Sequence, residues 1–478
     1  MKSLSGIDGA FLHLETPQTP MHVASLHLFD LPPGYRGDFH ADIQHLMRSR
    51  VHLAPVFTRK LTPMPLQFAN PVWVEDDAID FDYHVQRITL PSPGTTAQLQ
   101  HLAGRLHAEL LDRNRPLWRL AVIDGLQSGQ MGYYIQVHHA VLDGQAGVLL
   151  AQALFDITAE PRHVSAGKPL PAEHPGRAEL AAAALKHDAG QYVKLLRHLP
   201  EVLKTLGGLF GASAAKARGG LGQNFSFGPK TPLNVPITGE RGYAAVSIPL
   251  ASLKQLAQGH DATLNDVVLA LCSGALRRYL ARHGGSPNKP LIAAMPISLR
   301  QAGNVEYTTQ ATMSLVNLNT QIADPVLRMH AIRDAAGAVK ALARQAQGVL
   351  PTDFPSIGTP WLLQALAALY GRPAIADAMP TFANLAISNV PGPQLPLYAA
   401  GARMASYWPL SIVEHGLGLN ITVMSYAGAM GFGFTTATAA VPDPQQLSAA
   451  LLEALHEMQA PRRRVLRKNV VAEALPAA

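Results

Sequence analysis

The chain has 478 residues, of which 48% are hydrophobic and 15% are charged. A single hydrophobic core stops growing at roughly 250–300 residues, so we expect at least two domains. The composition excludes a disordered chain, and the low charged fraction favours apolar grooves on the surface. The formal net charge of +6 is spread along the sequence. This favours anionic partners such as phosphorylated cofactors or lipid headgroups over a dedicated nucleic-acid surface.

The single cysteine, Cys272, excludes an intrachain disulfide and a cysteine-based zinc site. It lies in an apolar segment with no basic neighbour, as expected for a buried and unreactive thiol. Asp8 and Glu15 interrupt the amino terminus, where a signal peptide needs an unbroken apolar run. No stretch approaches the ~20 apolar residues of a membrane span. We therefore expect a cytoplasmic protein that contacts membranes only peripherally.

Hydrophobic periodicity predicts strands and helices in alternation in both halves of the chain. The elements expected in the first half are a strand at 21–29, a helix at about 38–50, extended segments at 72–77 and 81–90, a helix at 97–111, paired strands at 119–124 and 132–137, and a helix from about 145. Those expected in the second half are a strand at 241–250, a helix at 264–281 opened by a Thr263–Asp266 capping box, buried strands at 290–299 and 312–320, a helix from Asp324-Pro325 to about 347, strands at 383–390, 417–426 and 431–439, and a helix at 443–459.

The two similar halves predict two α/β domains that face each other across a cleft. The expected boundaries are a first domain at 1–180, a helical linker at 181–240, a second domain at 241–460 and a basic tail at 461–478.

An apolar stripe runs from Tyr192 to Phe210, with Pro200 as an expected kink. Two interpretations are open: a crossover helix packed between the domains, or an interfacial helix lying on a membrane. The basic segment Arg462–Lys468 would strengthen binding to anionic lipid, or it is simply a solvated tail.

The segment HHAVLDG at 138–144 carries the clearest signature of chemistry. It follows a predicted strand and precedes a helix, where a side chain is held by the sheet yet can reach a cleft. Histidine suits general-base catalysis near neutral pH, because its unperturbed pKa is about 6.5. Asp143 can fix the loop, while Gly144 and Gly147 allow a tight turn and close approach.

Two other interpretations of the motif stay open. The adjacent histidines could ligate a metal ion. Successive strand residues point to opposite faces, however, so His138 and His139 should not reach one ion, and we expect no metal site. Both could instead be buried structural residues whose hydrogen bonds are satisfied.

HHAVLDG matches the HHxxxDG motif of the chloramphenicol-acetyltransferase-like acyltransferases, which depend on CoA or a carrier. More narrowly, the chain resembles the bacterial wax ester synthase/diacylglycerol acyltransferase family from end to end. The segments that carry this resemblance are LSGIDGAFLHLE at 4–15, PMHV at 20–23, PLW at 116–118, LNDVVLALCSGALRRYL at 264–280, NLAISNVPGPQLPLY at 384–398 and LNITVMSYAG at 419–428. The resemblance implies two chloramphenicol-acetyltransferase-like α/β sandwich domains, with mixed sheets flanked by helices, joined by a helical crossover and sharing an active site at their interface.

The resemblance also implies acyl transfer from acyl-CoA to an alcohol. The product is a wax ester from a fatty alcohol or triacylglycerol from diacylglycerol. His139 is the implied base, which takes the alcohol proton as oxygen attacks the thioester and then returns it to the CoA thiolate. His138 is expected to be a packing or positioning residue. Asp143 is expected to orient the loop, paired with an arginine such as Arg59 or Arg300.

The tetrahedral intermediate needs a hydrogen-bond donor for its oxyanion, and Asn265 is the first candidate. The alternative is that Asn265 and Asp266 merely cap the helix at 264–281. The segment SNVPGP at 388–393 reads locally as a rigid turn, and by resemblance it lies near the acyl-CoA side of the cleft. The candidate substrate-binding residues are Gly144, Asp266, Ser388, Asn389, Pro391 and Gly392. Trp118 of PLW is expected to be a core anchor under the motif strand.

We expect direct transfer in a ternary complex without an acyl-enzyme. Cys272 lacks an activating neighbour, and neither Ser388 nor Ser411 lies in a GxSxG elbow. No permanently bound cofactor is expected, since acyl-CoA serves as co-substrate. The expected partners are long-chain acyl-CoA, a fatty alcohol or diacylglycerol, a peripheral membrane or lipid-inclusion surface and a second copy in a homodimer, but no nucleic acid. A carrier-dependent condensation-like enzyme and a non-catalytic lipid-droplet binding protein remain as alternatives.

Overall fold

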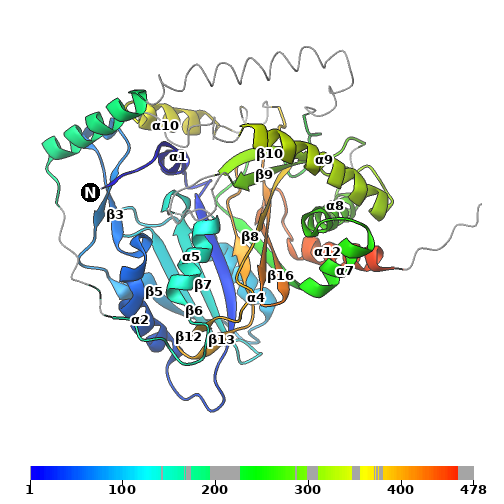
Figure 1. Ribbon diagram of the computed structural model, residues 1–478, viewed down its shortest axis with the longest axis horizontal. Coiled ribbons are helices and arrows are strands. Elements are labelled where there is room, and N and C mark those ends of the chain that lie inside the picture. Colours follow the sequence, from blue (N-terminus) through cyan, green and yellow to red (C-terminus); the bar gives the residue numbers. More distant parts are fainter. Residues whose placement is uncertain are drawn as a thin grey trace, which may run out of the picture.

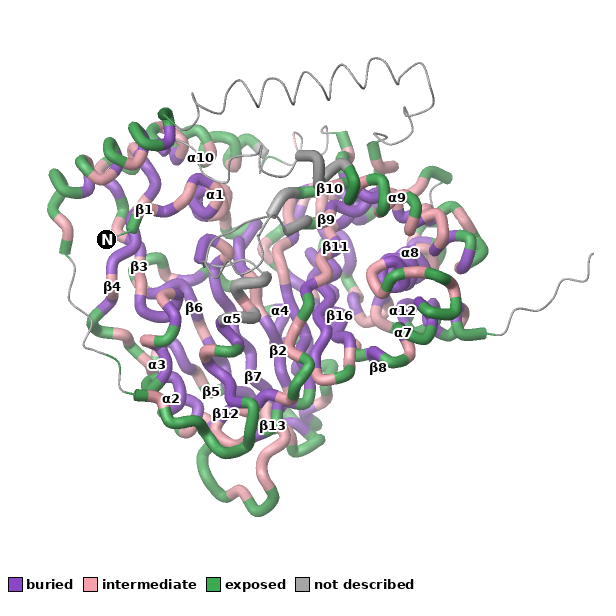
Figure 2. The backbone as a smooth tube through the Cα atoms, viewed as in Figure 1, coloured by how far each residue is buried: buried purple, intermediate pink, exposed green. Residues whose placement is uncertain are grey.

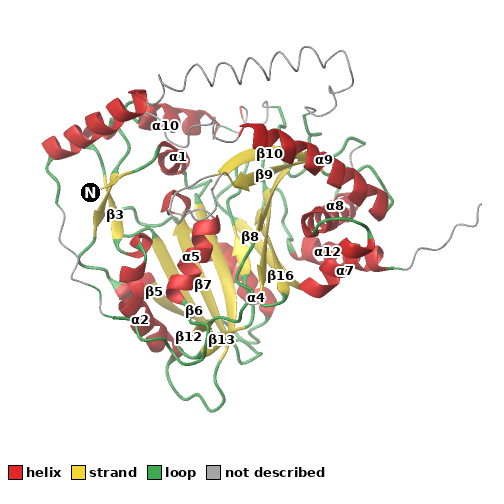
Figure 3. Ribbon diagram, in the orientation of Figure 1, coloured by secondary structure: helices red, strands yellow, loops and turns green. Residues whose placement is uncertain are grey.

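The computed structural model describes residues 2–141, 144–165, 167, 174–193, 227–285, 288–298, 311–346, 356–370, 372, 375 and 380–460. Figures 1 and 3 show two mixed sheets lying side by side, with helices packed around them. The predicted α/β class is thereby confirmed. The helices are α1 (Gly6–Leu14), α2 (Phe39–Arg50), α3 (Phe81–His84), α4 (Thr96–Ala108), α5 (Gly144–Leu154), α7 (Leu250–Gly259), α8 (Leu264–Arg282), α9 (Pro325–Ala346), α10 (Thr359–Tyr370) and α12 (Gln445–Gln459), with short 3-10 turns at Val51–Leu53, Pro55–Phe57, Pro65–Gln67 and His139–Val141.

The first sheet has the order β12-β13-β2-β7-β6-β5, and β14 also pairs with β2. Its strands are β2 (His22–Asp30), β5 (Val85–Thr89), β6 (Trp118–Asp124), β7 (Met131–His138), β12 (Tyr398–Ala399), β13 (Ala402–Met404) and β14 (Trp408–Leu410). Helices α2 and α5 join one hydrophobic cluster of this sheet and α4 joins another. Because apolar side chains on both faces of the sheet are covered, β7 is buried along nearly its whole length (Figure 2).

The second sheet has the order β10-β9-β11-β15-β16-β8. Its strands are β8 (Arg241–Pro249), β9 (Ile292–Ser298), β10 (Ala311–Asn317), β11 (Leu385–Val390), β15 (Leu419–Tyr426) and β16 (Ala429–Ala437). Helices α7, α8, α9 and α12 bury their apolar faces in the core of this half. A small separate sheet, β1 (Lys2–Ser3), β4 (Val72–Glu75) and β3 (Arg59–Thr62), packs against the helix over 177–193.

The topology departs from the expected domain boundaries at residues 398–410. These residues lie inside the predicted second domain, yet β12, β13 and β14 belong to the first sheet. Strand β14 pairs antiparallel with β2, with Leu410 opposite Ala24. The backbone hydrogen bonds of this short segment are satisfied by the other half of the chain. Residues 411–418 then connect β14 of the first sheet to β15 of the second.

Two local predictions succeed or fail for clear reasons. The capping box is confirmed, because the Thr263 side chain accepts from the Asp266 N–H and the Asp266 carboxylate accepts from the Thr263 N–H. The extended interpretation of 81–90 is wrong at its start. There, Asp80 caps the helical turn α3 by accepting the Tyr83 N–H.

Strand β10 exists but is not buried as expected, since Met313 is 59% exposed. It forms one end of the second sheet, so one of its sides lacks a neighbouring strand. The expected linker 181–240 is described at 181–193 and 227–240 only. Most of the stripe 192–210 and the basic tail 461–478 lie outside the described residues.

Candidate active site

The two histidines of the motif lie where β7 ends and a short 3-10 turn begins. The N–H of His138 donates to the carbonyl of Leu117 at 3.0 Å, and the N–H of His139 donates to the carbonyl of Met21 at 2.8 Å. The predicted position between a strand and a helix is confirmed. Gly144 begins α5, whereas Asp143 lies outside the described residues.

His138 ends β7 and His139 begins the 3-10 turn, and their side chains enter different surroundings. His138 is 0% exposed and turns toward Glu15. The ring of His139 lines a cavity and stacks on Phe11 of α1, with 4.0 Å between ring centroids and 21° between planes. One imidazole therefore reaches open space, while its neighbour is enclosed by protein.

The cavity has a volume of about 650 Å³ and lies between the two sheets. Apolar atoms dominate its wall, which includes Phe11, Val23, Leu150, Asn389, Thr422 and Met424. These residues come from α1, β2, α5, β11 and β15, so both halves of the chain contribute. A long apolar chain fits such a wall, and the His139 side chain lies beside it.

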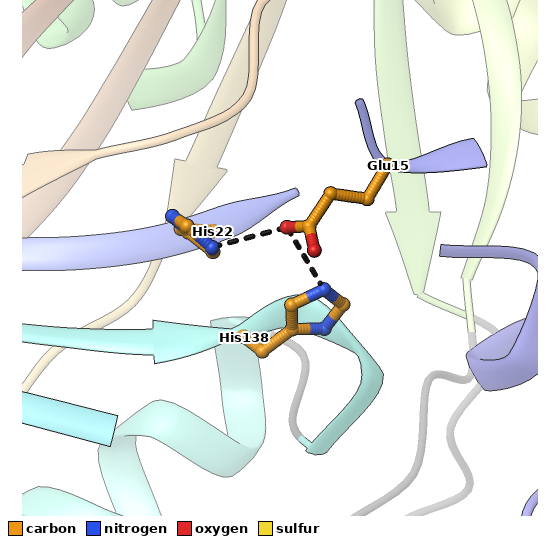
Figure 4. Close-up of side chains that lie close together, drawn as sticks. All are labelled: Glu15, His22 and His138. Carbon is orange, nitrogen blue, oxygen red and sulfur yellow. Dashed lines mark ion pairs between the residues drawn. The ribbon is translucent and has the colours of Figure 1, made fainter. Parts of the chain in front are cut away.

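Glu15, His22 and His138 form a closed polar cluster behind the motif (Figure 4), which we call the Glu15 cluster. The Nε2 atoms of His22 and His138 lie 3.1 and 3.2 Å from Oε1 of Glu15, and Arg113 binds Oε2 at 2.8 Å. Burial alone would raise the pKa of Glu15. The hydrogen bonds from His138 and His22 outweigh burial and hold this pKa well below its usual value. Glu15 therefore carries a negative charge.

Hydrogen bonds on the far side of each ring determine the histidine tautomers. Nδ1 of His138 accepts from the N–H of Ala140 at 3.0 Å, and Nδ1 of His22 accepts from Nε2 of Gln136 at 2.6 Å. Both Nε2 atoms therefore carry a proton that points to Glu15. A metal ion would need these Nε2 atoms deprotonated, which would set an Nδ1–H against each of those donors. The arrangement fits a hydrogen-bonded cluster, and the expectation of no metal site stays a prediction.

Comparison with known proteins identifies the family. Residues 4–268 match the wax ester synthase/diacylglycerol acyltransferase catalytic domain, and residues 308–459 match the C-terminal domain of the same family. A Mycobacterium tuberculosis protein named as a probable diacylglycerol O-acyltransferase is 36% identical over 457 residues, covering 95% of this chain and 97% of its own. The chain belongs to the wax ester synthase/diacylglycerol acyltransferase family.

Solved structures agree with this assignment. The wax ester synthase/diacylglycerol acyltransferase from Marinobacter aquaeolei VT8 has a TM-score of 0.69 at 28% identity, covering 96% of this chain and 99% of its own. The first condensation domain of the calcium-dependent antibiotic synthetase has a TM-score of 0.57 at 15% identity, covering 96% of this chain and 97% of its own. At that identity the likeness concerns the fold alone. The predicted family, the two-domain chloramphenicol-acetyltransferase-like fold and the acyltransferase class are all confirmed.

The structure separates the other candidate residues of this acyltransferase into two groups. Ser388, Asn389 and Pro391 line the cavity. Gly392 is not part of that wall, and its expected role in substrate binding stays a prediction. Its N–H donates to the Ser425 hydroxyl, and any Cβ at this position would clash with the Ser425 carbonyl. Its glycine is required by that close approach.

Asn265 and Asp266 also differ. Asp266 is 4% exposed and its carboxylate accepts hydrogen bonds in the capping box. Its expected contact with substrate stays a prediction. Oδ1 of Asn265 accepts from Nδ2 of Asn389 at 3.2 Å. Asn265 thus contacts a residue of the cavity wall.

Several supporting predictions can be placed. Trp118 is 0% exposed and stacks on His84, which confirms a core anchor under the motif strand. Arg59 pairs with Glu75 at 2.7 Å, while Arg300 and Asp143 lie outside the described residues. Cys272 is fully buried, and burial raises the pKa of its thiol to about 12, as expected for an unreactive side chain.

Sequence reasoning missed four ionisable residues around the site. Glu15 and His22 lie in two of the segments that carry the family resemblance, but nothing in their spacing along the sequence links them to His138. His27 lines the cavity, where burial lowers its pKa to about 3. Glu414 also lines the cavity, and burial raises its pKa. The signal that could have found such residues is an ionisable side chain inside an otherwise apolar segment, such as His27 in β2.

Proposed function

We propose that His139 is the general base of an O-acyltransferase that moves a long acyl chain from acyl-CoA to a fatty alcohol or a diacylglycerol. The main support for this proposal is that His139 lies in the wall of the apolar cavity between the two sheets. The imidazole takes the hydroxyl proton as the alcohol oxygen attacks the thioester carbonyl. When the C–S bond breaks, the same proton goes to the departing CoA thiolate. The names of the relatives support this substrate class.

The oxyanion of the tetrahedral intermediate needs a donor, which we place at the Asn265–Asn389 pair. The capping box leaves the Asn265 side chain free of the capping role, and Asn389 reaches the cavity wall. A donor held by a second side chain is preorganised, so little reorganisation is needed when the negative charge develops.

Transfer proceeds directly in a ternary complex, without an acyl-enzyme. The buried thiol of Cys272 has a pKa of about 12, so it is not a thiolate near neutral pH. Acyl-CoA is a consumed co-substrate, and the role of a second chain copy as partner stays a prediction.

We infer that the protein works at a lipid surface, which its water-insoluble acceptors require. Within the described residues, none of the helices has the length and hydropathy needed to span a bilayer. Helix α10 instead exposes a row of large apolar side chains, Trp361, Leu362, Leu366 and Leu369, of which Leu362 is 61% exposed. It lies beside α1, the helix that carries Phe11 over His139 (Figure 1). An apolar helix face of this kind inserts into the headgroup boundary of a bilayer or monolayer.

The decisive experiment incubates purified protein with palmitoyl-CoA and either hexadecanol or a diacylglycerol, and measures CoA release and lipid products. We expect ester formation that requires the acceptor and disappears in His139→Ala. Unchanged turnover in a folded His139→Ala variant would exclude the proposed base. Acyl transfer only from a carrier-bound thioester would favour the condensation-like alternative, and lipid binding without CoA release would favour a binding protein.

A further inference from the structure

Glu15 connects the first helix to the catalytic loop through two separate hydrogen-bond routes. It follows α1 directly, and its side chain is 2% exposed. Its Oε1 accepts the N–H of Met21 at 3.1 Å, besides facing Nε2 of His22 and His138. Its Oε2 accepts from Arg113. Three of these contacts converge on Oε1 and Arg113 binds Oε2, so both oxygens of the carboxylate are held by the surrounding protein.

The first route runs through Met21. Its N–H donates to Glu15, and its carbonyl accepts the N–H of His139 at 2.8 Å. The backbone of Met21 thus links the Glu15 carboxylate to the backbone of His139. Any shift of the Glu15 carboxylate moves the acceptor that holds the backbone of His139.

The second route runs through the ring of His138. Nδ1 of His138 accepts the N–H of Ala140 at 3.0 Å, so the ring proton lies on Nε2, which is 3.2 Å from Oε1 of Glu15. Ala140 lies in the 3-10 turn that carries His139. With the other tautomer, an Nδ1–H would face the Ala140 N–H, and this turn would lose its hydrogen bond.

A third contact comes from the same helix. Phe11 precedes Glu15 by about one helical turn, so both side chains lie over the same stretch of neighbouring chain. Phe11 stacks on the ring of His139 while Glu15 holds the backbone beneath it. The position of His139 therefore depends on α1 from two directions.

The charges in this region are balanced. Glu15 is the anion, Arg113 is its cationic partner, and both histidines of the cluster are neutral in the tautomers described above. The other ionisable groups that face His22 are His107 and Arg119, which act on it electrostatically. A buried carboxylate with a full set of donors is rigid, because losing any one contact leaves a costly unpaired group.

We propose that Glu15 is a positioning residue for the base, holding the His139 turn through Met21 and through the tautomer of His138. This inference rests on the proposed role of His139. It differs from a purely structural role because Glu15 also places a negative charge in the hydrogen-bonded network that holds the base, and it faces the protonated Nε2 of His138.

The test compares Glu15→Ala and Glu15→Gln with wild type in the palmitoyl-CoA and hexadecanol assay. The alanine variant removes all acceptors, so we expect kcat to fall at least tenfold, while KM for palmitoyl-CoA changes less than threefold. The glutamine variant keeps one acceptor oxygen on the histidine side and should retain more activity. Loss of the negative charge disfavours the imidazolium, so the acid limb of its kcat/KM pH profile should move to lower pH.

Glu75→Ala and Glu75→Gln are matched controls, since Glu75 is a half-buried carboxylate that pairs with Arg59 in the small sheet. Both should keep wild-type kcat and an unmoved pH profile. If Glu15→Ala does not fold, the glutamine variant alone decides, through its acid limb. The proposal is overturned if the folded Glu15 variants match the Glu75 controls in kcat and pH profile while His139→Ala is inactive. Full activity in His139→Ala would instead overturn the proposed base itself.

Discussion

Two regions separated by one peptide bond have opposite chemistry in this protein. Behind β7, His138 joins a closed cluster with Glu15 and His22, where every side chain is buried and polar. In front of β7, His139 lines an apolar cavity and stacks on Phe11. The strand ends at His138 and the 3-10 turn begins at His139, so the two imidazoles enter different surroundings, which decide what each can do. We propose that the buried ring orders the turn, while the ring in the cavity wall serves as the base.

The sharpest way to break this comparison is to replace each histidine in turn. His139→Ala should lower kcat by roughly 10²–10⁴-fold, the usual contribution of a general base, with little change in the melting temperature. His138→Ala should cost less activity but more stability, because it leaves the buried Glu15 short of a donor. Steady-state kinetics and thermal melts on the same preparations check both. Equal losses of kcat in the two variants would contradict the division of roles.

Much of the fold could be predicted because its long helices and strands show the hydrophobic pattern of their type along their own sequence. The helix Leu264–Arg282 has its capping box in sequence, and β7 and β15 are apolar runs of strand length. Strand β14 could not be predicted, because three residues carry no period and its partner β2 lies in the other half of the chain. For the same reason, the sequence does not indicate that strands within residues 398–410 join the first sheet.

The candidate site divides in a similar way. HHAVLDG and the cavity residues Ser388 and Asn389 could be read from motif and resemblance, because they lie in continuous segments. Glu15 and His22 could not be assigned a role, since their chemistry depends on a contact with His138 that only the folded chain makes. Asp266 and Gly392 lie in the same motifs as Asn265 and Asn389, and the contacts that the structure shows for them are local, a helix cap and a close backbone approach. Adjacency in sequence does not separate such neighbours.

A second prediction sharpens the chemistry on the cavity side. Asn265→Ala should lower kcat by about 10²–10³-fold if Asn265 helps to bind the oxyanion. Thr263→Ala removes the capping box and should cost ~1 kcal/mol of stability with activity retained at a permissive temperature. Kinetics and melting temperatures of both variants provide the check. A variant of Asn265 that loses stability but keeps kcat would return this residue to a capping role.

A third prediction extends the comparison from the cavity to the surface beside it. Leu362→Glu with Leu366→Glu places charges on the exposed face of α10, and each buried leucine contributes roughly 1.5–3 kcal/mol. Binding to vesicles of phosphatidylcholine and phosphatidylglycerol, measured by co-sedimentation, should fall by at least tenfold. Leu452→Glu is the matched control, an exposed leucine on α12. Equal binding by the double variant and the control would remove α10 from the lipid contact.

The smallest expected effect concerns Glu414, the carboxyl group in the cavity wall. Burial raises its pKa, and within the described residues no ionic or hydrogen-bond partner of its carboxylate offsets that burial. Because the unfolded chain releases this proton at a lower pH than the native state, stability is lost as pH rises above the ordinary glutamate range toward the native pKa. Glu414→Gln lacks this loss, so its melting temperature relative to wild type should rise between pH 5 and pH 8, on the order of 1–2 °C. Ionisable groups that the two proteins share cancel in this difference. A difference that stays constant with pH would show that the Glu414 carboxyl group is already ionised. The cavity wall would then be more polar than the contrast between an apolar cavity and a polar Glu15 cluster requires.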